Sequence, residues 1–435
     1  MKTYDKYKPS GIPWIGQIPE HWEVKRIKAI TTSISKGNGI SKEQVIADGD
    51  VPCVRYGEIY AKYTHSFTKC ISKTKLEELT TPRYFTYGDI LCAGTGELTE
   101  EIGKSIVYLG KEKCLAGGDI IILKHTQNPA FLNYAFNSDY AQNQKSCGKA
   151  KLKVVHISSC EIGNVNIILP PLSEQEAIVS YLDGKTARID QLLALYGRQE
   201  QLLAELKQTT IAHAVTHGLN PNTPTKPTNI PWLNEIPQHW EVKRNKSFLK
   251  PTEEVVGDRK DEFTLLSLTK QGVIIRDLSE RKGKFPKEYD SYLVVRPDNI
   301  VFCLFDMDET PRTVGLVKNV GMLTGAYTNF EINQKMALPE YVYYFYEYID
   351  DIKGMKPYYS GLRKVVKRNT FLQLNIPLPP LSEQQEIVAY INEKCEKIDR
   401  QITSIRRQIE LLQEYKQRLI ADLVTGHFKP NGEAQ

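Results

Sequence analysis

The 435-residue sequence contains no apolar run close to the roughly 18–20 residues that a membrane-spanning helix needs. Its first twenty residues, Met1 to Glu20, lack the apolar core of a signal peptide. The eight cysteines are scattered singly, with no Cys-x-x-Cys pair, which favours reduced thiols over a disulfide framework. These absences together predict a cytoplasmic protein without a membrane partner.

The sequence also lacks the motifs of cofactor-dependent catalysis. Gly94-Thr95-Gly96 has neither the lysine of a phosphate-binding loop nor dinucleotide-binding spacing, so it predicts a turn. Asn128-Pro129-Ala130-Phe131 lacks the second proline of the Asn-Pro-Pro-aromatic loop of amino-methyltransferases, and a helix start is the better interpretation. We therefore expect no cofactor in this chain.

Two further patterns are too incomplete to predict a catalytic or metal site. Glu23-Val24-Lys25 and Glu241-Val242-Lys243 resemble half of a nuclease motif, but no suitably placed Pro-Asp precedes them. His213 and His217 stand four residues apart on a predicted helix without an evident third ligand, so solvated histidines are favoured over a metal pair. We predict a non-catalytic chain that serves in recognition or as a scaffold.

The composition is that of an ordinary globular protein with a weak positive charge. Hydrophobic residues make up 41% and charged residues 25%, which excludes wholesale disorder. The 57 basic and 52 acidic residues give a net charge of +5, which permits nucleic-acid binding without proving it.

An internal repeat sets the architecture. The segment Ile12–Arg26, here called the His-Trp motif, returns as Ile230–Arg244, and Leu169–Gln175, here called the Pro-Pro motif, returns as Leu378–Gln384. Between these motifs the two halves are almost unrelated. The chain is therefore a tandem duplication of one unit, in which a variable domain is followed by a similar helix.

Both segments after the Pro-Pro motifs have the periodicity of long helices. Ser173 and Ser382 are expected as N-caps, because Glu176 and Gln385 complete the capping-box pattern three residues later. Apolar residues then recur near every seventh position and must pack against another helix. They are Leu182, Ile189, Tyr196 and Leu203 in the first helix, and Ile391, Ile398, Ile405, Leu412 and Leu419 in the second.

The linker between the repeats favours antiparallel packing of these helices. Residues 218–229 reach about 40 Å when extended, whereas the first helix spans about 65 Å. A parallel pair would need the chain to return along most of that length. An antiparallel pair would place the variable domains at opposite ends, related by approximate two-fold symmetry.

We therefore predict an α+β fold, in which two mixed α/β variable domains are separated by two long antiparallel coiled-coil helices. The expected boundaries are a first variable domain at 1–172, a first long helix at 173–217, a linker at 218–229, a second variable domain at 230–381, a second long helix at 382–427, and a tail at 428–435.

Charge separates the variable domains from the helices. The domains carry +5 and +3, and the helices −2 and −1. Within each domain basic residues gather just before the Pro-Pro motif, in stretches without acids. These candidate DNA-binding residues are Lys145, Lys149, Lys151 and Lys153 in the first domain, and Lys356, Arg363, Lys364, Lys367 and Arg368 in the second. Lys36, Arg55 and Tyr56 are secondary candidates; solvated basic loops are the alternative.

The whole pattern resembles the specificity subunit of type I restriction-modification systems. The resemblance rests on the doubled His-Trp and Pro-Pro motifs and on the heptad helices that end in Val215-Thr216 and Val424-Thr425. One departure is the last turn, where His217-Gly218 stands against Gly426-His427, so the equivalence of the helix ends is open.

The resemblance implies that each variable domain is a target recognition domain for one half of a bipartite, asymmetric site in double-stranded DNA. It implies partners as well: two modification subunits that use S-adenosylmethionine to methylate adenine, and two restriction subunits that use ATP and Mg for translocation and cleavage. The helix pair would dock these subunits and fix the spacing between the half-sites.

Two alternatives remain open. One is a coiled-coil scaffold whose variable domains bind proteins. The other is the recognition arm of another type of modification system, which has the same sequence logic and differs in its partner genes.

Overall fold

The computed structural model describes residues 2–12, 15–76, 82–149, 154–276 and 289–430. The chain divides into two compact units. Unit 1 consists of Met1–Gly197 and Arg407–Gln435, and unit 2 consists of Arg198–Arg406. Each unit therefore holds one variable domain, the beginning of the long helix that follows it, and the end of the other long helix.

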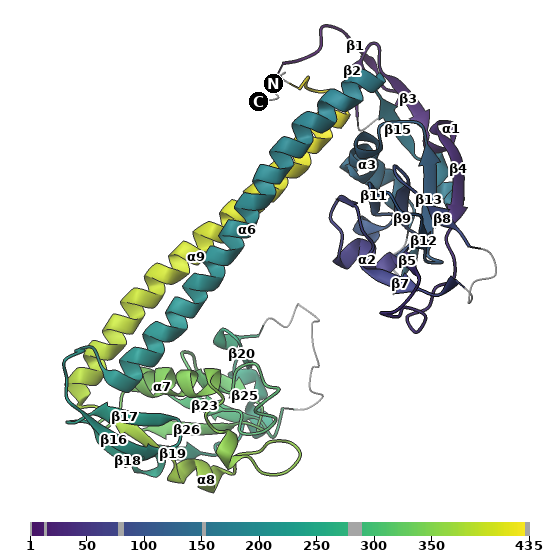
Figure 1. The fold of residues 1–435 in the computed structure, drawn as a ribbon. Helices are drawn as coiled ribbons and strands as arrows, with labels where there is room; N and C mark the ends of the chain where they lie inside the picture. Colours follow the sequence, from purple (N-terminus) through teal and green to yellow (C-terminus); the bar gives the residue numbers. More distant parts are fainter. Residues whose placement is uncertain (1, 13–14, 77–81, 150–153, 277–288, 431–435) are drawn as a thin grey trace. The chain divides into compact units, whose positions relative to one another are not determined.

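The first variable domain is a mixed α/β domain, and two sheets form its body (Figure 1). The larger has the order β4-β13-β9-β11-β6 and the smaller β7-β5-β12-β8, with parallel pairing at β11–β6 and β12–β5. The bounds are β4 Thr31–Lys36, β5 Val51–Val54, β6 Ser66–Phe67, β7 Ser72–Thr74, β8 Tyr84–Phe85, β9 Ile90–Ala93, β11 Ser105–Tyr108, β12 Cys114–Ala116 and β13 Ile120–His125.

Short helices and two-stranded pairs complete this domain. The helices are α1 Ile27–Ile30, α2 Tyr56–Ala61, α3 Pro129–Asn137, α4 Asp139–Ser146 and α5 Ser159–Asn164, with a 3₁₀ turn at Thr99–Glu101. The paired strands are β1 Tyr7–Pro9 with β2 Gln17–Pro19, β10 Thr95–Gly96 with β14 Val155–His156, and β3 Glu23–Arg26 with β15 Asn166–Leu169. Pro129 stands in the first turn of α3, where its missing N–H costs nothing.

The second variable domain is built around the sheet β19-β26-β23-β24. Its strands are β16 Thr225–Ile230, β17 Leu233–Pro237, β18 Glu241–Arg244, β19 Leu249–Thr252, β20 Leu266–Thr269, β21 Gly272–Ile275, β22 Leu293–Val295, β23 Ile300–Phe302, β24 Val314–Leu316, β25 Gly321–Leu323, β26 Thr328–Ile332 and β27 Asn375–Leu378. Its helices are α7 Pro339–Asp351 and α8 Arg368–Gln373, with 3₁₀ turns at Asn245–Ser247, Gly257–Glu262 and Lys356–Tyr358.

The long helices are α6, Leu172–His217, and α9, Leu381–Val424. The 46 residues of α6 span about 69 Å. In both units the helices lie side by side and antiparallel (Figure 1), as the sequence predicts. Ion pairs fix the register: Asp190 with Lys416 (2.6 Å) in unit 1, and Asp399 with Lys207 (2.7 Å) in unit 2. No helix among the described residues is long and apolar enough to cross a membrane.

The predicted N-cap of each of these helices is wrong by two residues. Ser173 and Ser382 lie inside the first turn, because α6 begins at Leu172 and α9 at Leu381. The Pro171 carbonyl accepts a hydrogen bond from the Gln175 N–H (3.0 Å), so the second proline of the motif takes the N-cap position. The Pro380 carbonyl does the same for Gln384 (2.9 Å).

The two repeated motifs meet in each unit. Strand β3 of the first His-Trp motif pairs with β15, which leads into the Pro-Pro motif, and β18 pairs with β27 in the same way. The pairing brings the start of each variable domain beside its end. Each domain is thus a closed insertion between two fixed strands, and its interior sequence can vary while the frame stays the same.

A buried tryptophan and a glutamate lock this meeting point. Trp22 has no exposed surface, and its indole N–H donates to the Glu174 carboxylate at 3.1 Å. His21 Nε2 lies 2.6 Å from the same carboxylate. Unit 2 repeats the arrangement with Trp240 and His239 on Glu383, at 3.0 Å and 2.7 Å. We call this arrangement the carboxylate clamp.

Both long helices are followed by a glycine with a left-handed backbone, although the two glycines stand one position apart in the repeat. Gly218 after α6 and Gly426 after α9 both have left-handed backbones, with φ of 74° and 76°. A side chain at Gly426 would lie 2.4 Å from the Pro19 ring and 3.0 Å from Trp22, and one at Gly218 would lie 3.3 Å from Trp240. Each helix therefore ends on the tryptophan of a carboxylate clamp, where only glycine fits.

The carboxylate clamp predicts a measurable loss of stability. Burial raises the pKa of Glu174, but hydrogen bonds from His21, Trp22 and Tyr4 outweigh it and hold the pKa below its ordinary value. Glu174→Ala leaves the buried indole N–H unpaired and should lower the free energy of unfolding by about 1–3 kcal/mol. Because the folded pKa is depressed, this contribution is present above the unfolded pKa of about 4.3 and is lost as pH falls.

The measurement is urea unfolding at pH 7 and pH 4. Glu176→Ala is the matched control, since Glu176 is exposed two residues further along α6; it should change stability by less than about 0.5 kcal/mol. Equal stability of Glu174→Ala and Glu176→Ala at pH 7 would contradict the clamp.

Candidate nucleic-acid interface and helix-pair pockets

The structure corrects one of the DNA-binding candidates of the first domain. Lys145 is 1% exposed, and its ammonium group donates to the backbone carbonyls of Gly103 and Phe136, both at 2.9 Å. Its side chain therefore points into the domain at the end of α4 and cannot reach a phosphate. Burial lowers the pKa of Lys145 to about 8.

Lys149 lies near the surface but is engaged by its own loop. Its ammonium group donates to the His156 carbonyl (2.6 Å) and to the Glu161 carboxylate (2.7 Å). These bonds, with those from Ser158, lower the pKa of Glu161 to about 2. Lys149 thus links the residues that follow α4 to β14 and to the start of α5. Lys151 and Lys153 lie outside the described residues.

The secondary candidates of the first domain lie on neighbouring segments. Lys36 is exposed at the end of β4 and lines a pocket of about 240 Å³ together with His156 and Glu161, the partners of Lys149. Asn38 bridges to Gly117, whose N–H donates to the Val54 carbonyl at 2.7 Å. Arg55 and Tyr56 follow directly at the start of α2, half-buried and exposed respectively. The fold thus places Lys36 beside the residues that bind Lys149, and it places Arg55 next to the segment that follows Lys36.

In the second domain the basic candidates surround one hairpin, which immediately precedes α8 (Figure 1). Ser360 and Val365 exchange two backbone hydrogen bonds, of 2.9 and 3.0 Å, which close a turn over residues 361–364. We call residues 360–365 the basic hairpin. Gly361 and Lys364 have positive φ, 70° and 48°, as a tight turn requires.

The two arginines near this hairpin form ion pairs with acidic residues of other segments, whereas three lysines do not. Arg363 Nε donates to Asp306 at 3.1 Å, and its guanidinium stacks on Phe305. The guanidinium in turn lowers the pKa of Asp306. Arg368 forms an ion pair with Glu253. Lys356, Lys364 and Lys367 are exposed and have no ion-pair partner among the described residues.

Sequence reasoning missed one residue of the basic hairpin. Leu362 stands at its tip and is 100% exposed. The signal was present in Ser360-Gly361-Leu362-Arg363-Lys364, where a single large apolar residue follows a glycine inside a basic turn. Counting charges did not detect it.

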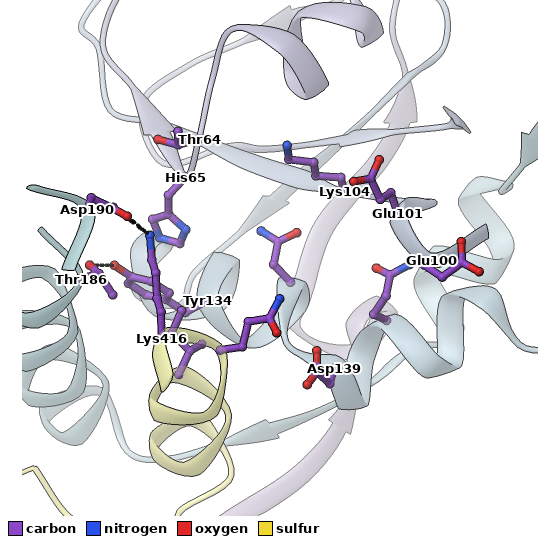
Figure 2. Close-up of a pocket in the computed structure, with 14 residues that line it drawn as sticks. Thr64, His65, Glu100, Glu101, Lys104, Tyr134, Asp139, Thr186, Asp190 and Lys416 are labelled. Carbon is purple, nitrogen blue, oxygen red and sulfur yellow. Dashed lines mark hydrogen bonds and ion pairs between the residues drawn. The ribbon is translucent and has the colours of Figure 1, made fainter. Parts of the chain in front are cut away.

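A polar pocket of about 390 Å³ lies in unit 1 between the variable domain and the long helices (Figure 2). Lys416 of α9 pairs with Asp190 of α6, and the Tyr134 hydroxyl donates to Asp183 at 2.8 Å. The His65 ring stacks on Tyr134 with centroids 3.7 Å apart. Burial, followed by the charge of Lys416, lowers the pKa of His65 to about 4, so the ring is neutral at physiological pH.

Unit 2 repeats this frame with a different rim. The corresponding residues, 209 or 210 positions away in the repeat, include Tyr344, which donates to Asn392, and Asp399, which pairs with Lys207. The charged residues that line the pocket in unit 1 are Glu100, Glu101, Asp139, Asp190, Lys104 and Lys416, and those that line the pocket in unit 2 are Lys207, Lys270, Lys318, Arg400, Glu347, Glu396 and Asp399. Acidic side chains thus outnumber basic ones in the unit 1 pocket, and basic side chains outnumber acidic ones in the unit 2 pocket.

The described residues contain no group of three or more His, Cys, Asp or Glu side chains that could hold a metal ion. The His213 and His217 rings stack with centroids 5.2 Å apart.

The buried ammonium of Lys145 predicts a pH effect. Its folded pKa, near 8, lies below the unfolded value of about 10.4, so between these values the unfolded chain binds more protons. The free energy of unfolding should therefore rise with pH through this window, relative to a Lys145→Met variant. Urea unfolding at pH 7.5, 9 and 10 measures the difference. If the free energy of unfolding changed equally with pH in the wild type and in Lys145→Met, the burial of the Lys145 ammonium group would be contradicted.

Comparisons with known proteins agree with this architecture. Residues 19–201 and 305–413 match the model of the type I restriction modification DNA specificity domain family. The chain is 26% identical to a putative type I restriction enzyme MjaX specificity subunit of Methanocaldococcus jannaschii, over 95% of each sequence. It is 23% identical to the type I restriction enzyme EcoKI specificity subunit of Escherichia coli K12, over 97% of this chain and 92% of that one.

A solved structure, described as the basis of complex assembly and conformational transition of the type I R-M system, has the same fold. It aligns with 94% of this chain and 99% of that chain, with a TM-score of 0.71 and 14% identity. With two repeated frames, two long antiparallel helices and a family match over more than half of its length, the chain belongs to the type I restriction-modification DNA specificity family.

Proposed function

We propose that this chain selects the DNA sequence on which a type I restriction-modification complex acts, and that each variable domain reads one half of a bipartite, asymmetric site. The observation that carries the proposal is the repeated frame. Strand pairs β3–β15 and β18–β27 and the two carboxylate clamps are the same, while the domains between them differ in sheet order and in exposed residues. Two different surfaces on one frame suit two different half-sites.

Double-stranded DNA is the partner that the charges favour. The exposed lysines around the basic hairpin, Lys356, Lys364 and Lys367, are free to neutralise phosphates, whereas Arg363 and Arg368 are occupied by acids. In the first domain the exposed Lys36 is the corresponding candidate. Phosphate contacts of this kind position a protein, and base contacts from the hairpin would give the sequence preference.

The helix pair supports the docking of two modification subunits. The ion pair between Asp190 and Lys416 sets the register of the two antiparallel helices. Moving five residues along each helix from this pair, in opposite chain directions, leads to Leu195 of α6 and Leu411 of α9, which therefore lie at the same height along the helix pair in unit 1. They are 66% and 46% exposed. Leu192 and Tyr415 extend this exposed apolar face. Solvent-exposed apolar side chains at helical spacing are suited to receive helices of another chain.

The proposal assigns recognition to this chain and chemistry to its partners. The two modification subunits would bind S-adenosylmethionine and methylate adenine, and two restriction subunits would use ATP and Mg to translocate and cleave DNA. The complex would act in the cytoplasm, where the host DNA lies.

Methylation mapping tests the proposal. The chain is co-expressed with the adjacent modification gene, and methylated adenines are mapped across the host DNA. We expect one bipartite sequence. Replacing residues 27–168 with the same segment of a relative should change one half of that sequence and leave the other half unchanged, because the carboxylate clamp and the long helices lie outside the replaced segment.

The outcomes distinguish the alternatives. A scaffold protein would give no methylated sequence and no sequence preference in filter binding to duplex DNA. A change in both halves after the replacement would contradict the modular assignment. Activity only with a partner gene of another modification type would identify the recognition arm of such a system.

If modification subunits dock on the helix pair, substitutions there should weaken assembly of the complex without altering the variable domains. Leu195→Asp combined with Leu411→Asp should weaken binding of the modification subunit by about tenfold or more, since charges would have to be buried in the interface. Co-purification and analytical ultracentrifugation measure the assembly. The matched control is Gln191→Asp with Gln413→Asp, which adds the same charge at exposed polar positions of the same helices. Equal assembly of both double variants would contradict this docking face.

A further inference from the structure

Leu362 is the most exposed large apolar residue of the described chain. Its side chain is 100% exposed, and Leu195 follows at 66%. A leucine in this position contributes nothing to the core, since it buries no apolar surface when the chain folds. Its place at the tip of the basic hairpin therefore needs another reason.

The hairpin holds Leu362 in a fixed position. Besides the two hydrogen bonds between Ser360 and Val365, the Ser360 hydroxyl donates to the Val365 carbonyl at 2.9 Å. The Val366 N–H donates to the Leu304 carbonyl at 2.9 Å, which ties the hairpin to the segment after β23. A tip supported in this way loses little conformational freedom when it binds a surface.

Arg363 supports the tip from behind. The Asp306 N–H donates to the Arg363 carbonyl at 2.6 Å, while the Arg363 side chain binds the Asp306 carboxylate and stacks on Phe305. Arg363 is thus a positioning residue of the hairpin. The side chains left for a ligand at the tip are Leu362 and Lys364.

The surroundings of the tip favour a polyanion. The segment from Ile352 to Ser382 contains no acidic residue, and the acids that lie against it, Asp306 and Glu253, are paired with Arg363 and Arg368. The lysines Lys356, Lys364 and Lys367 are exposed there without an ion-pair partner in the described part of the chain. The major groove of DNA is bordered by negative phosphates, and the methyl group of thymine is an apolar group on its base edges. A tip with one apolar side chain and nearby unpaired lysines is complementary to this surface.

We propose that Leu362 packs against a thymine methyl group in the major groove, within the half-site that the second variable domain reads. The inference rests on the proposed function and adds a specificity-determining residue to it. The basic hairpin is a four-residue turn closed by the single bridge between Ser360 and Val365. The major groove is about 12 Å wide and admits a whole α-helix, so an element of this size fits. Lys364, next to Arg363, would contact a flanking phosphate.

Deoxyuridine substitution isolates this contact, because it removes the methyl group and leaves the hydrogen-bonding edge of the base unchanged. The experiment uses the chain in complex with its modification subunits and a duplex that carries its mapped site. Each thymine of the second half-site is replaced singly. The wild-type complex should lose about fourfold in affinity at one position, as expected for one buried methyl group.

Variants show whether Leu362 makes that contact. Leu362→Ala should bind the thymine and deoxyuridine duplexes equally and keep the thermal stability of the wild type. Lys364→Ala should weaken both duplexes equally and reduce the salt dependence by about one ion. Val320→Ala is the matched control, since Val320 is 51% exposed in the same domain outside the hairpin; it should discriminate the duplexes as the wild type does.

Two results would overturn the inference: discrimination retained by Leu362→Ala, or no thymine of the second half-site that responds to deoxyuridine. Failure of the proposed function looks different, because the wild-type complex would then bind all duplexes without sequence preference.

Discussion

The contact between Glu174 and the His21-Trp22 pair is the constraint on which unit 1 depends. One carboxylate accepts from a fully buried indole and an imidazole at the first turn of α6, so it joins the start of the variable domain to the start of the helix. The end of α9 closes on the same tryptophan through Gly426. Three chain segments that are far apart in sequence thus meet at one buried side chain, and unit 2 repeats the meeting at Trp240.

Because the carboxylate clamp and the frame strands join each domain to the long helices, the residues between the frame strands are free to diverge. The larger sheet of the first domain has five strands, whereas that of the second has four, although both domains lead into their helices through the same strand pair. The pockets beside the long helices follow the same rule. Their Tyr and Asp-Lys frame is duplicated, but the other lining residues differ: Glu100 and Glu101 line the pocket in unit 1, and Lys270 and Lys318 line the pocket in unit 2.

The sequence predicted the parts of the fold that repetition and periodicity encode. The two motifs, the two long helices and their antiparallel packing follow from exact recurrence and from heptads such as Ile391 and Ile398, which the structure buries. The start of each helix was misplaced, because the pattern of serine with a glutamate cannot reveal that the Pro171 carbonyl already accepts the first helical bond. Charge counting was weaker still, since it could not distinguish the buried Lys145 from exposed lysines, nor find the uncharged Leu362.

The joining of the chain termini has a genetic consequence. In unit 1 the Lys429 N–H donates to the Lys2 carbonyl at 2.7 Å, and the Tyr7 hydroxyl donates to the Gly426 carbonyl at 3.2 Å, so the end of α9 leads to β1 as the end of α6 leads through the linker to β16. The residues after α9 thus lie against those before β1, in the same relation that the linker gives to α6 and β16 in the other repeat. One repeat therefore encodes the carboxylate clamp, the frame strands and the ion pair of the helices, and two copies of a half-length chain could associate through these same contacts.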